Sequence, residues 1–275
     1  MSDPGIDEIG PWSEVKLEIV QKYAKAYSTI LSMQPGLTHV YIDGFAGTGA
    51  NVSRMSGAVV PGSASIALEI DPPFAEYHLV DLDPSRVEAL RRLQSNRLNV
   101  FVYQGDCNRV LLQNVIPNVQ YVQYRRGLCL LDPYGLDLSW KVIEAAGKSN
   151  AIDLFLNFPV MDMNRNVLWK NREAVEPTQA ARMTFFWGDE SWRDAAWDTK
   201  RDLFGHPEKV ENEAIAAVFQ DRLQRVAGFK YVPDPMPMKI STGAVVYYLF
   251  FAAQKRPAND IVTDIFNKYR DWGKR

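Results

Sequence analysis

Continuous apolar runs recur along the first 160 residues and alternate with stretches whose apolar residues have helical spacing. Five such runs predict strands, at 38–43, 77–83, 100–103, 128–131 and 152–156. Their apolar residues are consecutive rather than alternating, which is typical of strands buried on both faces of a sheet. Strands that alternate with helices in this way predict a parallel α/β sheet.

The ends of the chain add helices and an antiparallel pair. Apolar residues such as Val15 and Ile19 predict a helix over 13–33, with Ser13 placed to cap its start. The apolar runs 229–232 and 244–251 have no long helix between them, so they predict an antiparallel hairpin at the end of the sheet. A last helix is expected at about 258–270.

Residues 160–225 interrupt this rhythm and are expected to form a helical insert. The insert holds four of the seven tryptophans of the chain. Two interpretations remain open, since buried tryptophans could form the core of a helical cap, whereas exposed ones could line a substrate lid. In a lid, Trp169 would stack on a base and Arg165 would meet a phosphate, so these two are the candidate substrate-binding residues.

Composition excludes several classes of protein. The chain has 275 residues, 47% hydrophobic, and no apolar run approaches the roughly 20 residues that a membrane span requires. We expect one domain over 1–275 and no membrane partner. Residues 1–8 are acidic and turn-rich, unlike a signal peptide, so a cytoplasmic location is expected. Cys107 and Cys129 fit neither a disulfide framework nor zinc spacing, and no metal site is predicted. The net charge of −2 argues against general polyanion binding but allows a local basic cleft.

The segment Asp43-Gly44-Phe45-Ala46-Gly47-Thr48-Gly49 directly follows the first predicted strand. Glycine has no Cβ, so such a turn lets a nucleotide approach the backbone closely. Asp43 would repel a pyrophosphate but attract the sulfonium and ammonium of S-adenosylmethionine (SAM). The pattern therefore favours SAM over NAD, whose glycine fingerprint lacks this acid. An ordinary tight turn between a strand and a helix is the alternative.

Further acids follow the second and third predicted strands. Asp81 can accept hydrogen bonds from both hydroxyls of a ribose, and Asp83 could take that role or cap the next helix. Asp106 can accept a hydrogen bond from an adenine amine, cap a helix at 108–116, or do both. Acids at successive strand ends, with the glycine turn and the closing hairpin, predict a Rossmann-like class I methyltransferase sheet, mostly parallel with an antiparallel C-terminal hairpin.

Asp132-Pro133-Tyr134-Gly135 follows the fourth predicted strand and is the candidate catalytic segment. The Asp132 carboxylate and the Pro133 carbonyl could accept hydrogen bonds from a substrate amine and so align its lone pair with a methyl donor. The ring of Tyr134 could stack on a planar substrate. The alternative is a type I turn, for which Asp-Pro-x-Gly is a favoured sequence.

Several of these motifs together resemble the three-Cys-motif partner protein (TcmP) family. The resemblance is carried by Trp12-Ser13-Glu14-Val15-Lys16-Leu17, Tyr41–Gly49, Gly62-Ser63 and Leu131–Gly135. It covers about residues 12–160 and resumes in the strand at 244–254, while the insert is only loosely similar. Members of this family resemble class I SAM-dependent methyltransferases and are encoded in bacteria and on mobile elements, beside a small protein with a three-cysteine motif.

The resemblance implies a SAM site and a possible protein partner. It implies SAM binding at Asp43, Gly44, Gly47, Gly49 and Asp81, and Lys16 and Ser63 also match the family pattern. Lys16 could lie near the cofactor carboxylate, with a solvated helical lysine as the alternative. Phe45 of the glycine turn and Asp106 at its strand end complete the expected cofactor-binding residues. Asp-Pro-Tyr-Gly is similar to the Asp-Pro-Pro-Tyr of nucleic-acid amino-methyltransferases but lacks the second proline. The sequence thus predicts a SAM-dependent methyltransferase acting on an amine, including a nucleobase in DNA or RNA. The alternative is a partner of the three-Cys-motif protein without methyl transfer.

Overall fold

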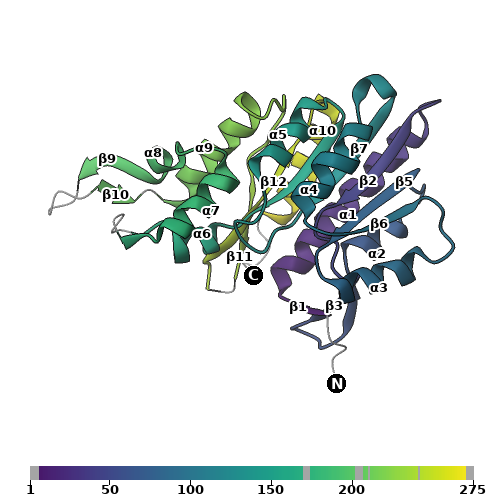
Figure 1. The fold of residues 1–275 in the computed structure, drawn as a ribbon, viewed down its shortest axis with the longest axis horizontal. Helices are drawn as coiled ribbons and strands as arrows, with labels where there is room; N and C mark the ends of the chain where they lie inside the picture. The colour runs from purple at the N-terminus through teal and green to yellow at the C-terminus, as the bar shows by residue number, and fades with distance from the viewer. Residues whose placement is uncertain (1–5, 170–173, 202–206, 210, 241, 271–275) are drawn as a thin grey trace.

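A seven-stranded sheet forms the centre of the molecule. The computed structural model describes residues 6–169, 174–201, 207–209, 211–240 and 242–270 (Figure 1). The strand order is β11-β12-β8-β7-β2-β5-β6. These strands are, in chain order, β2 (Thr38–Asp43), β5 (Glu76–Asp81), β6 (Val100–Gln104), β7 (Arg125–Leu131), β8 (Ile152–Phe158), β11 (Met236–Lys239) and β12 (Val245–Ala252).

The first five strands of this sheet are parallel, and β12 runs antiparallel to both β8 and β11. This arrangement confirms the predicted class of an α/β, mostly parallel sheet with an antiparallel C-terminal end. Their apolar runs are explained by position, since β2, β5, β7 and β8 are buried almost throughout. The reversal of chain order between β2 and β7 leaves a crevice at the carboxyl ends of these strands.

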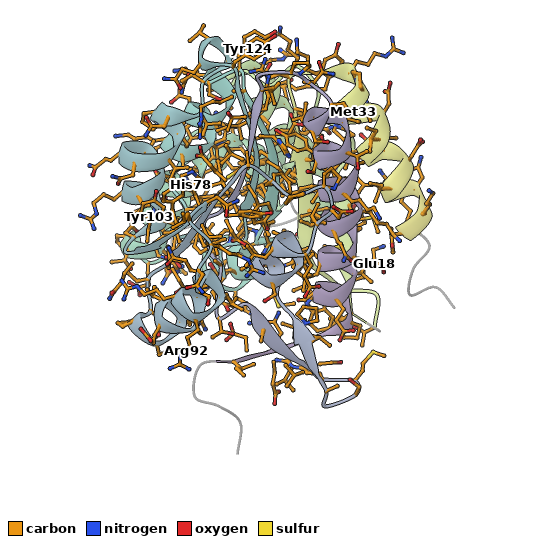
Figure 2. The ribbon with its side chains drawn as sticks, turned by 90° about the vertical axis from the view of Figure 1, so that its right-hand side faces the viewer. Glu18, Met33, His78, Arg92, Tyr103 and Tyr124 are labelled. Atoms are coloured by element: carbon orange, nitrogen blue, oxygen red, sulfur yellow. The ribbon has the colours of Figure 1, made fainter. Side chains whose placement is uncertain are left out.

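Helices cover both faces of the sheet. One face packs against α1 (Pro11–Ser32), α2 (Ser63–Leu68), α3 (Pro84–Gln94) and α10 (Arg256–Tyr269). Figure 2 shows α1 and α10 on the same side of the sheet, and Lys22 of α1 lies 5.5 Å from the ring centre of Tyr269 in α10. The other face carries α4 (Cys107–Val110), its continuation Leu111–Val115, and α5 (Trp140–Lys148). No helix in the described ranges is long and apolar enough to cross a membrane.

Two predicted element boundaries are wrong. The first helix begins at Pro11 after Gly10, which makes no side-chain cap, so Ser13 does not cap it. The first strand of the C-terminal hairpin is β11, not 229–232, where only Tyr231 pairs, with Ala253. Pro233 and Pro235 lie between these pairings, and proline has no N–H to donate to a ladder.

A small sheet beside the glycine turn was not predicted. It consists of β1 (Asp7–Ile9), β3 (Ala50–Ser53) and β4 (Val59–Pro61), and β1 runs parallel to β3. These strands are short and carry little apolar pattern, so their sequence gives no strand signal. Their pairing nevertheless places β1 next to the crevice.

The insert extends from the β8 and β12 side of the molecule (Figure 1). It contains α6 (Val160–Asn166), α7 (Pro177–Trp187), α8 (Trp192–Ala196) and α9 (Asn212–Arg225). The expectation of a wholly helical insert misses an antiparallel pair, β9 (Trp197–Arg201) and β10 (Pro207–Lys209).

Most aromatic residues of the insert pack into a core shared with the sheet. Phe186, Trp187, Trp192 and Trp197 are buried, in one apolar cluster with Phe158 of β8. Core packing is therefore the correct interpretation for these four residues. Two aromatics differ, because Trp169 keeps 38% of its surface exposed and Phe185 keeps 47%.

Candidate active site

A cavity of about 320 Å³ lies at the carboxyl ends of the strands. Several parts of the chain enclose it: β1 with the start of α1, the glycine turn with β3, the start of α2, the loop after β7, the end of β8 and the start of β12. Its volume is at the lower end of the range for small-molecule sites, and its position is where α/β sheets bind ligands. Of the predicted site residues, it brings together Lys16, Phe45, Gly47, Gly49, Ser63, Asp132, Pro133 and Tyr134.

The glycine turn has the backbone that its glycines predict. Gly47 and Gly49 have φ angles of 62° and 80°, in the left-handed region that side chains disfavour. A Cβ on Gly49 would lie 2.3 Å from the Leu93 side chain, whereas a Cβ on Gly47 would meet nothing within 4 Å. A side chain at position 49 would therefore displace Leu93, whereas Gly47 leaves open space on the cavity side. Gly44 packs against Leu131 and does not line the cavity.

Asp43 lies beneath the turn rather than on the cavity surface. Its carboxylate is fully buried and accepts hydrogen bonds from the Phe45 N–H at 3.1 Å and the Tyr41 hydroxyl at 3.4 Å. Burial raises the pKa of Asp43 to about 6; the Asp132 charge also raises it, while hydrogen bonds from Ser63 and Phe45 oppose the shift. Asp43 thus holds the turn directly and can influence a cationic ligand through its field.

Asp81 also supports the turn. One oxygen accepts the Gly47 N–H at 2.9 Å and the other accepts the Asp83 N–H at 2.9 Å. Asp83 caps α3 by accepting hydrogen bonds from the backbone of Ser85 and Arg86. Asp81 is thereby tied to the glycine turn, although it does not line the cavity itself. Its carboxylate has further lone pairs, so the contact with Gly47 is compatible with the predicted ribose role.

Asp106 is exposed at the start of α4 and lies outside the cavity. It accepts the Arg109 N–H at 2.9 Å, so the helix-cap interpretation is correct. Its second oxygen is 3.3 Å from the Asn108 amide nitrogen. An adenine-binding role for Asp106 stays a prediction.

Lys16 and Asp132 form an ion pair inside the cavity. The Lys16 side chain is 7% exposed and that of Asp132 is 28% exposed. Burial alone would lower the pKa of Lys16, but the adjacent Asp132 carboxylate raises it above its usual range. The Lys16 ammonium also lies 5.4 Å from the ring centre of Tyr247 in β12. A charged lysine and a charged carboxylate therefore face the same small cavity.

Asn157, at the end of β8, supports the segment after β7. Its amide nitrogen donates to the Pro133 carbonyl at 3.3 Å. The side chain is buried and lines the cavity, and its Oδ1 atom has no hydrogen-bond partner among the described residues. An unpaired buried acceptor is unfavourable, which makes this oxygen a candidate partner for a ligand N–H or ammonium. Its place at the end of a strand, one strand after Asp132, is the sequence signal that points to it.

Tyr134 is 74% exposed and its hydroxyl donates to the Asp7 carboxylate of β1. Arg86 of α3 pairs with the same carboxylate at 2.8 Å and lies 5.8 Å from the Tyr134 ring centre. These contacts hold β1 across the mouth of the cavity. Asp7 was not among the predicted site residues, because no residue pattern near it indicates a strand.

The candidate substrate-binding residues are not in this cavity. Trp169 donates its indole N–H to the Arg165 carbonyl at 2.7 Å, so the two are neighbours at the C-terminal end of α6. The insert contacts the loop after β7 elsewhere, because Arg182 of α7 lies 3.4 Å from Asp137 in that loop. Arg182 also lies 3.5 Å from Asp162 of α6, within the insert.

Comparison with solved structures identifies the fold. No protein-family model matches the chain, and no curated protein matches its sequence. Protein LPL1258 from Legionella pneumophila is 13% identical, with a TM-score of 0.56, over 98% of this chain and 94% of that one. A provisionally assigned methyltransferase from Thermobifida fusca is 15% identical, over 89% of this chain and 84% of that one, with a TM-score of 0.42. Another, yhhF from Escherichia coli, is 14% identical over 85% of this chain and 87% of that one, with a TM-score of 0.35.

The chain has a Rossmann-like α/β fold with a mostly parallel seven-stranded sheet, and its fold resembles that of LPL1258 over most of both chains. The sheet order and the antiparallel β12 agree with that assignment. Membership of the TcmP family stays a prediction, because no family model matches. The likeness carries the fold alone at these identities, so substrate, cofactor and partner are matters of proposal.

Proposed function

We propose that this protein is a SAM-dependent methyltransferase that transfers a methyl group to an amine. The observation that supports this most is the cavity in which the glycine turn faces Asp132-Pro133-Tyr134. A cofactor-type turn and a set of amine acceptors thus share one site. SAM, when bound, would supply an electrophilic methyl group on its sulfonium.

The residues present fit the polar end of SAM. Lys16 offers a buried cation for the cofactor carboxylate, while Asn157 offers an unpaired acceptor for its ammonium group. Gly47 leaves its backbone open to a ligand, and Asp43 below adds negative potential toward the sulfonium. Asp81, which holds Gly47, would accept the ribose hydroxyls.

The Lys16–Asp132 pair connects cofactor binding to acceptor binding. Without ligand, each charge neutralises the other in a poorly hydrated site. When Lys16 turns to the cofactor carboxylate, Asp132 loses its partner and becomes available to an acceptor N–H. Cofactor binding would therefore favour acceptor binding, which predicts an ordered reaction.

Asp132 and the Pro133 carbonyl would accept hydrogen bonds from the acceptor amine and aim its lone pair at the methyl group. Most of the rate enhancement would come from this alignment and from the negative charge of Asp132 as the nitrogen becomes positive. Asn157 donates a hydrogen bond to the Pro133 carbonyl and would hold this carbonyl in position for the substrate amine. Tyr134 would contact a planar substrate at the mouth of the cavity.

For the acceptor we propose a nucleobase in DNA or RNA. Exposed Trp169 and Phe185 on the insert could stack on neighbouring bases, and Arg165 could meet a phosphate. The net charge of −2 means that such binding would depend on this local surface.

Calorimetric titration with SAM, S-adenosylhomocysteine and NAD tests the cofactor. We expect SAM and S-adenosylhomocysteine to bind and NAD not to bind. Lys16→Met should weaken SAM binding at least tenfold, while Lys25→Met, at an exposed position of the same helix, should not change it. Binding of NAD alone, or of neither cofactor, would refute the proposal.

Transfer from methyl-labelled SAM to DNA, RNA and protein substrates tests the reaction. Asp132→Asn should abolish transfer to any acceptor found in this assay while SAM still binds. SAM binding without transfer to any of these acceptors would instead favour the alternative function, a SAM-sensing partner of a small three-Cys-motif protein, and co-purification with that protein would test it.

A further inference from the structure

Two contiguous cavities lie at the opposite edge of the sheet from the candidate active site. They have volumes of about 400 Å³ and about 350 Å³. Both are lined by Tyr121, Asn150, Gln254 and Lys255. Asn150 lies shortly before β8, and Gln254 follows the antiparallel β12, so these residues mark the amino ends of the parallel strands. Neither cavity shares a lining residue with the candidate active site.

The smaller of these cavities is mostly apolar. The second half of α1 forms one wall with Tyr27 and Leu31, and the start of α10 forms another with Ala258 and Ile261. The acid in its lining is Asp153, which accepts the Tyr23 hydroxyl at 2.7 Å. Burial raises the pKa of Asp153 to about 7, so its negative charge is weak at neutral pH. This cavity suits an aromatic or aliphatic group.

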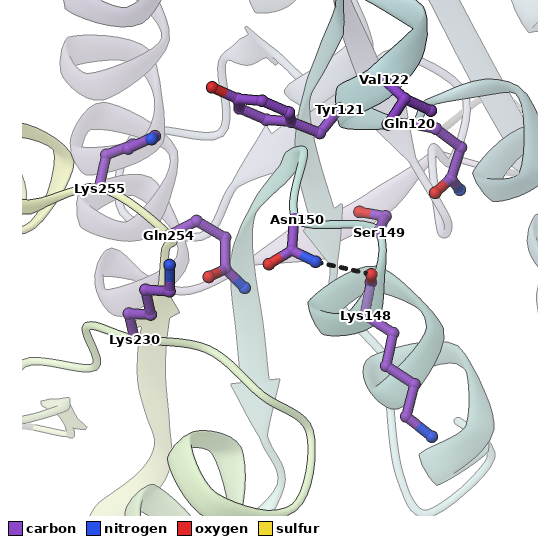
Figure 3. Close-up of a pocket in the computed structure, with 9 residues that line it drawn as sticks. All are labelled: Gln120, Tyr121, Val122, Lys148, Ser149, Asn150, Lys230, Gln254 and Lys255. Atoms are coloured by element: carbon purple, nitrogen blue, oxygen red, sulfur yellow. Dashed lines mark hydrogen bonds between the residues drawn. The ribbon is translucent and has the colours of Figure 1, made fainter.

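The larger cavity is polar and basic. Figure 3 shows Lys230, Lys255 and Gln254 entering it from one side, with Tyr121 and Asn150 across from them. Lys148 extends away from these side chains and pairs with Glu144 at 2.6 Å. Among the described residues, its lining contains no acidic side chain.

Positive charge continues into the region shared by both cavities. The Arg126 guanidinium lies 3.8 Å from the ring centre of Tyr121, and the Lys255 ammonium lies 5.3 Å from it. Arg126 lines the apolar cavity and Lys255 lines both. A negative group placed beside Tyr121 would therefore meet two cations held near one ring.

Gln254 supplies an unpaired polar atom in this region. Its amide nitrogen donates to the carbonyls of Gly147 and Gly228, each at 3.0 Å, which fixes the orientation of the side chain. The residue is 6% exposed, and its Oε1 atom has no hydrogen-bond partner in the described part of the chain. The fixed amide therefore leaves one acceptor for a donor group of a ligand.

We propose that these two cavities form one binding site for a small amphipathic anion. Its aromatic or aliphatic body would occupy the space between α1 and α10, and its carboxylate, sulfonate or phosphate would contact Lys230 and Lys255. The site is independent of methyl transfer. It shares α1 with the candidate active site, since Lys16 lies near the start of this helix and Tyr27 toward its end.

Fluorescence titration with 1-anilinonaphthalene-8-sulfonate, an aromatic sulfonate, tests the site, with neutral N-phenyl-1-naphthylamine as the uncharged probe. Combining Lys230→Ala with Lys255→Ala should weaken sulfonate binding about tenfold or more and change binding of the neutral probe less than about twofold. Ala258→Trp, which fills the apolar cavity, should abolish binding of both probes. Lys148→Ala is the matched control and should change neither.

Other outcomes would overturn the inference. If the sulfonate still binds both to the Lys230→Ala, Lys255→Ala variant and to the Ala258→Trp variant, the probe binds outside these two cavities. Displacement of the probe by S-adenosylhomocysteine would place it in the candidate active site, whereas we expect no displacement. Circular dichroism melting of each variant separates lost binding from lost fold, and Lys230→Ala with Lys255→Ala, both at exposed positions, should leave the melting temperature unchanged.

Discussion

Lys16 and Asp132 are 116 residues apart in the chain and form an ion pair within the candidate active site. The pair brings together the first long helix and the segment after the fourth parallel strand. Helical lysines are normally solvated, yet this one is buried against Tyr247. A buried charge that faces a cavity is expected to have a functional partner, and this pair leads to a first prediction about stability.

Lys16→Met should lower the free energy of unfolding by about 2–4 kcal/mol, because it leaves the Asp132 carboxylate without its partner in a poorly hydrated site. Adding Asp132→Asn should recover part of this loss, since no unpaired charge then remains. Urea unfolding of the wild type, both single variants and the double variant gives the coupling free energy. Lys25→Met should change stability by less than about 0.5 kcal/mol. Additive losses in the double variant would show that the two charges do not interact.

The buried Asp43 should make stability fall as pH rises. Its folded pKa of about 6 exceeds the ordinary value of 3.8, so the folded state binds a proton more tightly than the unfolded state. The stabilisation is complete below about pH 4 and is lost as pH rises through about 6; the shift corresponds to about 3 kcal/mol. Asp43→Asn removes this pH dependence. Between pH 4 and 7 the free energy of unfolding of the wild type should therefore fall relative to that of the variant. Asp153 titrates in both proteins and cancels from the comparison.

The same measurements at different pH values can contradict this prediction. Urea unfolding of wild type and Asp43→Asn at pH 4, 5, 6 and 7 should give two curves that are not parallel. If the two free energies of unfolding stay a constant distance apart, Asp43 does not titrate in this range. A difference that moves in favour of the wild type as pH rises would mean that the folded pKa is lowered, so that the hydrogen bonds to Asp43 outweigh the cost of its burial.

The sequence allowed the sheet and the glycine turn to be predicted because both depend on local patterns. Strand β2 was predicted at its observed bounds, since a strand buried on both faces must be apolar along its length. The turn after it needs glycine wherever φ is positive, as at Gly47 and Gly49. The predicted acids follow the ends of strands, and parallel strands direct their carboxyl ends to one edge of the sheet, so these acids could be placed near that edge.

What could not be predicted depends on contacts between distant segments. Strand β1 exists only through its pairing with β3, so Asp7 carried no signal that it would meet Tyr134. The exposed Asp106 and the buried Asp43 carry the same side chain, and only the structure shows that one caps a helix while the other lies beneath the cavity.

Gly47→Ala and Gly57→Ala should separate backbone strain from ligand contact. Their φ angles, 62° and 68°, are nearly equal, and a Cβ at either position meets nothing within 4 Å. Each substitution should therefore cost about 1–2 kcal/mol in stability, as expected for a side chain in the left-handed region. Only Gly47 lines the candidate active site, so only Gly47→Ala should weaken SAM binding in calorimetry. Equal SAM affinity in the two variants would place the cofactor away from this turn.

Asp7→Asn should loosen β1 over the mouth of the cavity. The change weakens the pairing with Arg86 and replaces the carboxylate that the Tyr134 hydroxyl contacts. Because Tyr134 and much of Asp7 are exposed, the loss in unfolding free energy should stay below about 1 kcal/mol. SAM should nevertheless dissociate several-fold faster, which stopped-flow fluorescence with a displacing excess of S-adenosylhomocysteine would measure.

Glu8→Gln is the matched control for this prediction, since Glu8 lies on the same strand and lines the same cavity. Its pairing with Arg54 is longer, at 3.8 Å, and its side chain is 68% exposed, so it contributes little to holding β1. We expect Glu8→Gln to leave the dissociation rate unchanged. Equal acceleration in both variants would trace the effect to lost negative charge near the cavity. An unchanged rate in Asp7→Asn would show that the contacts among Asp7, Arg86 and Tyr134 do not retain the cofactor.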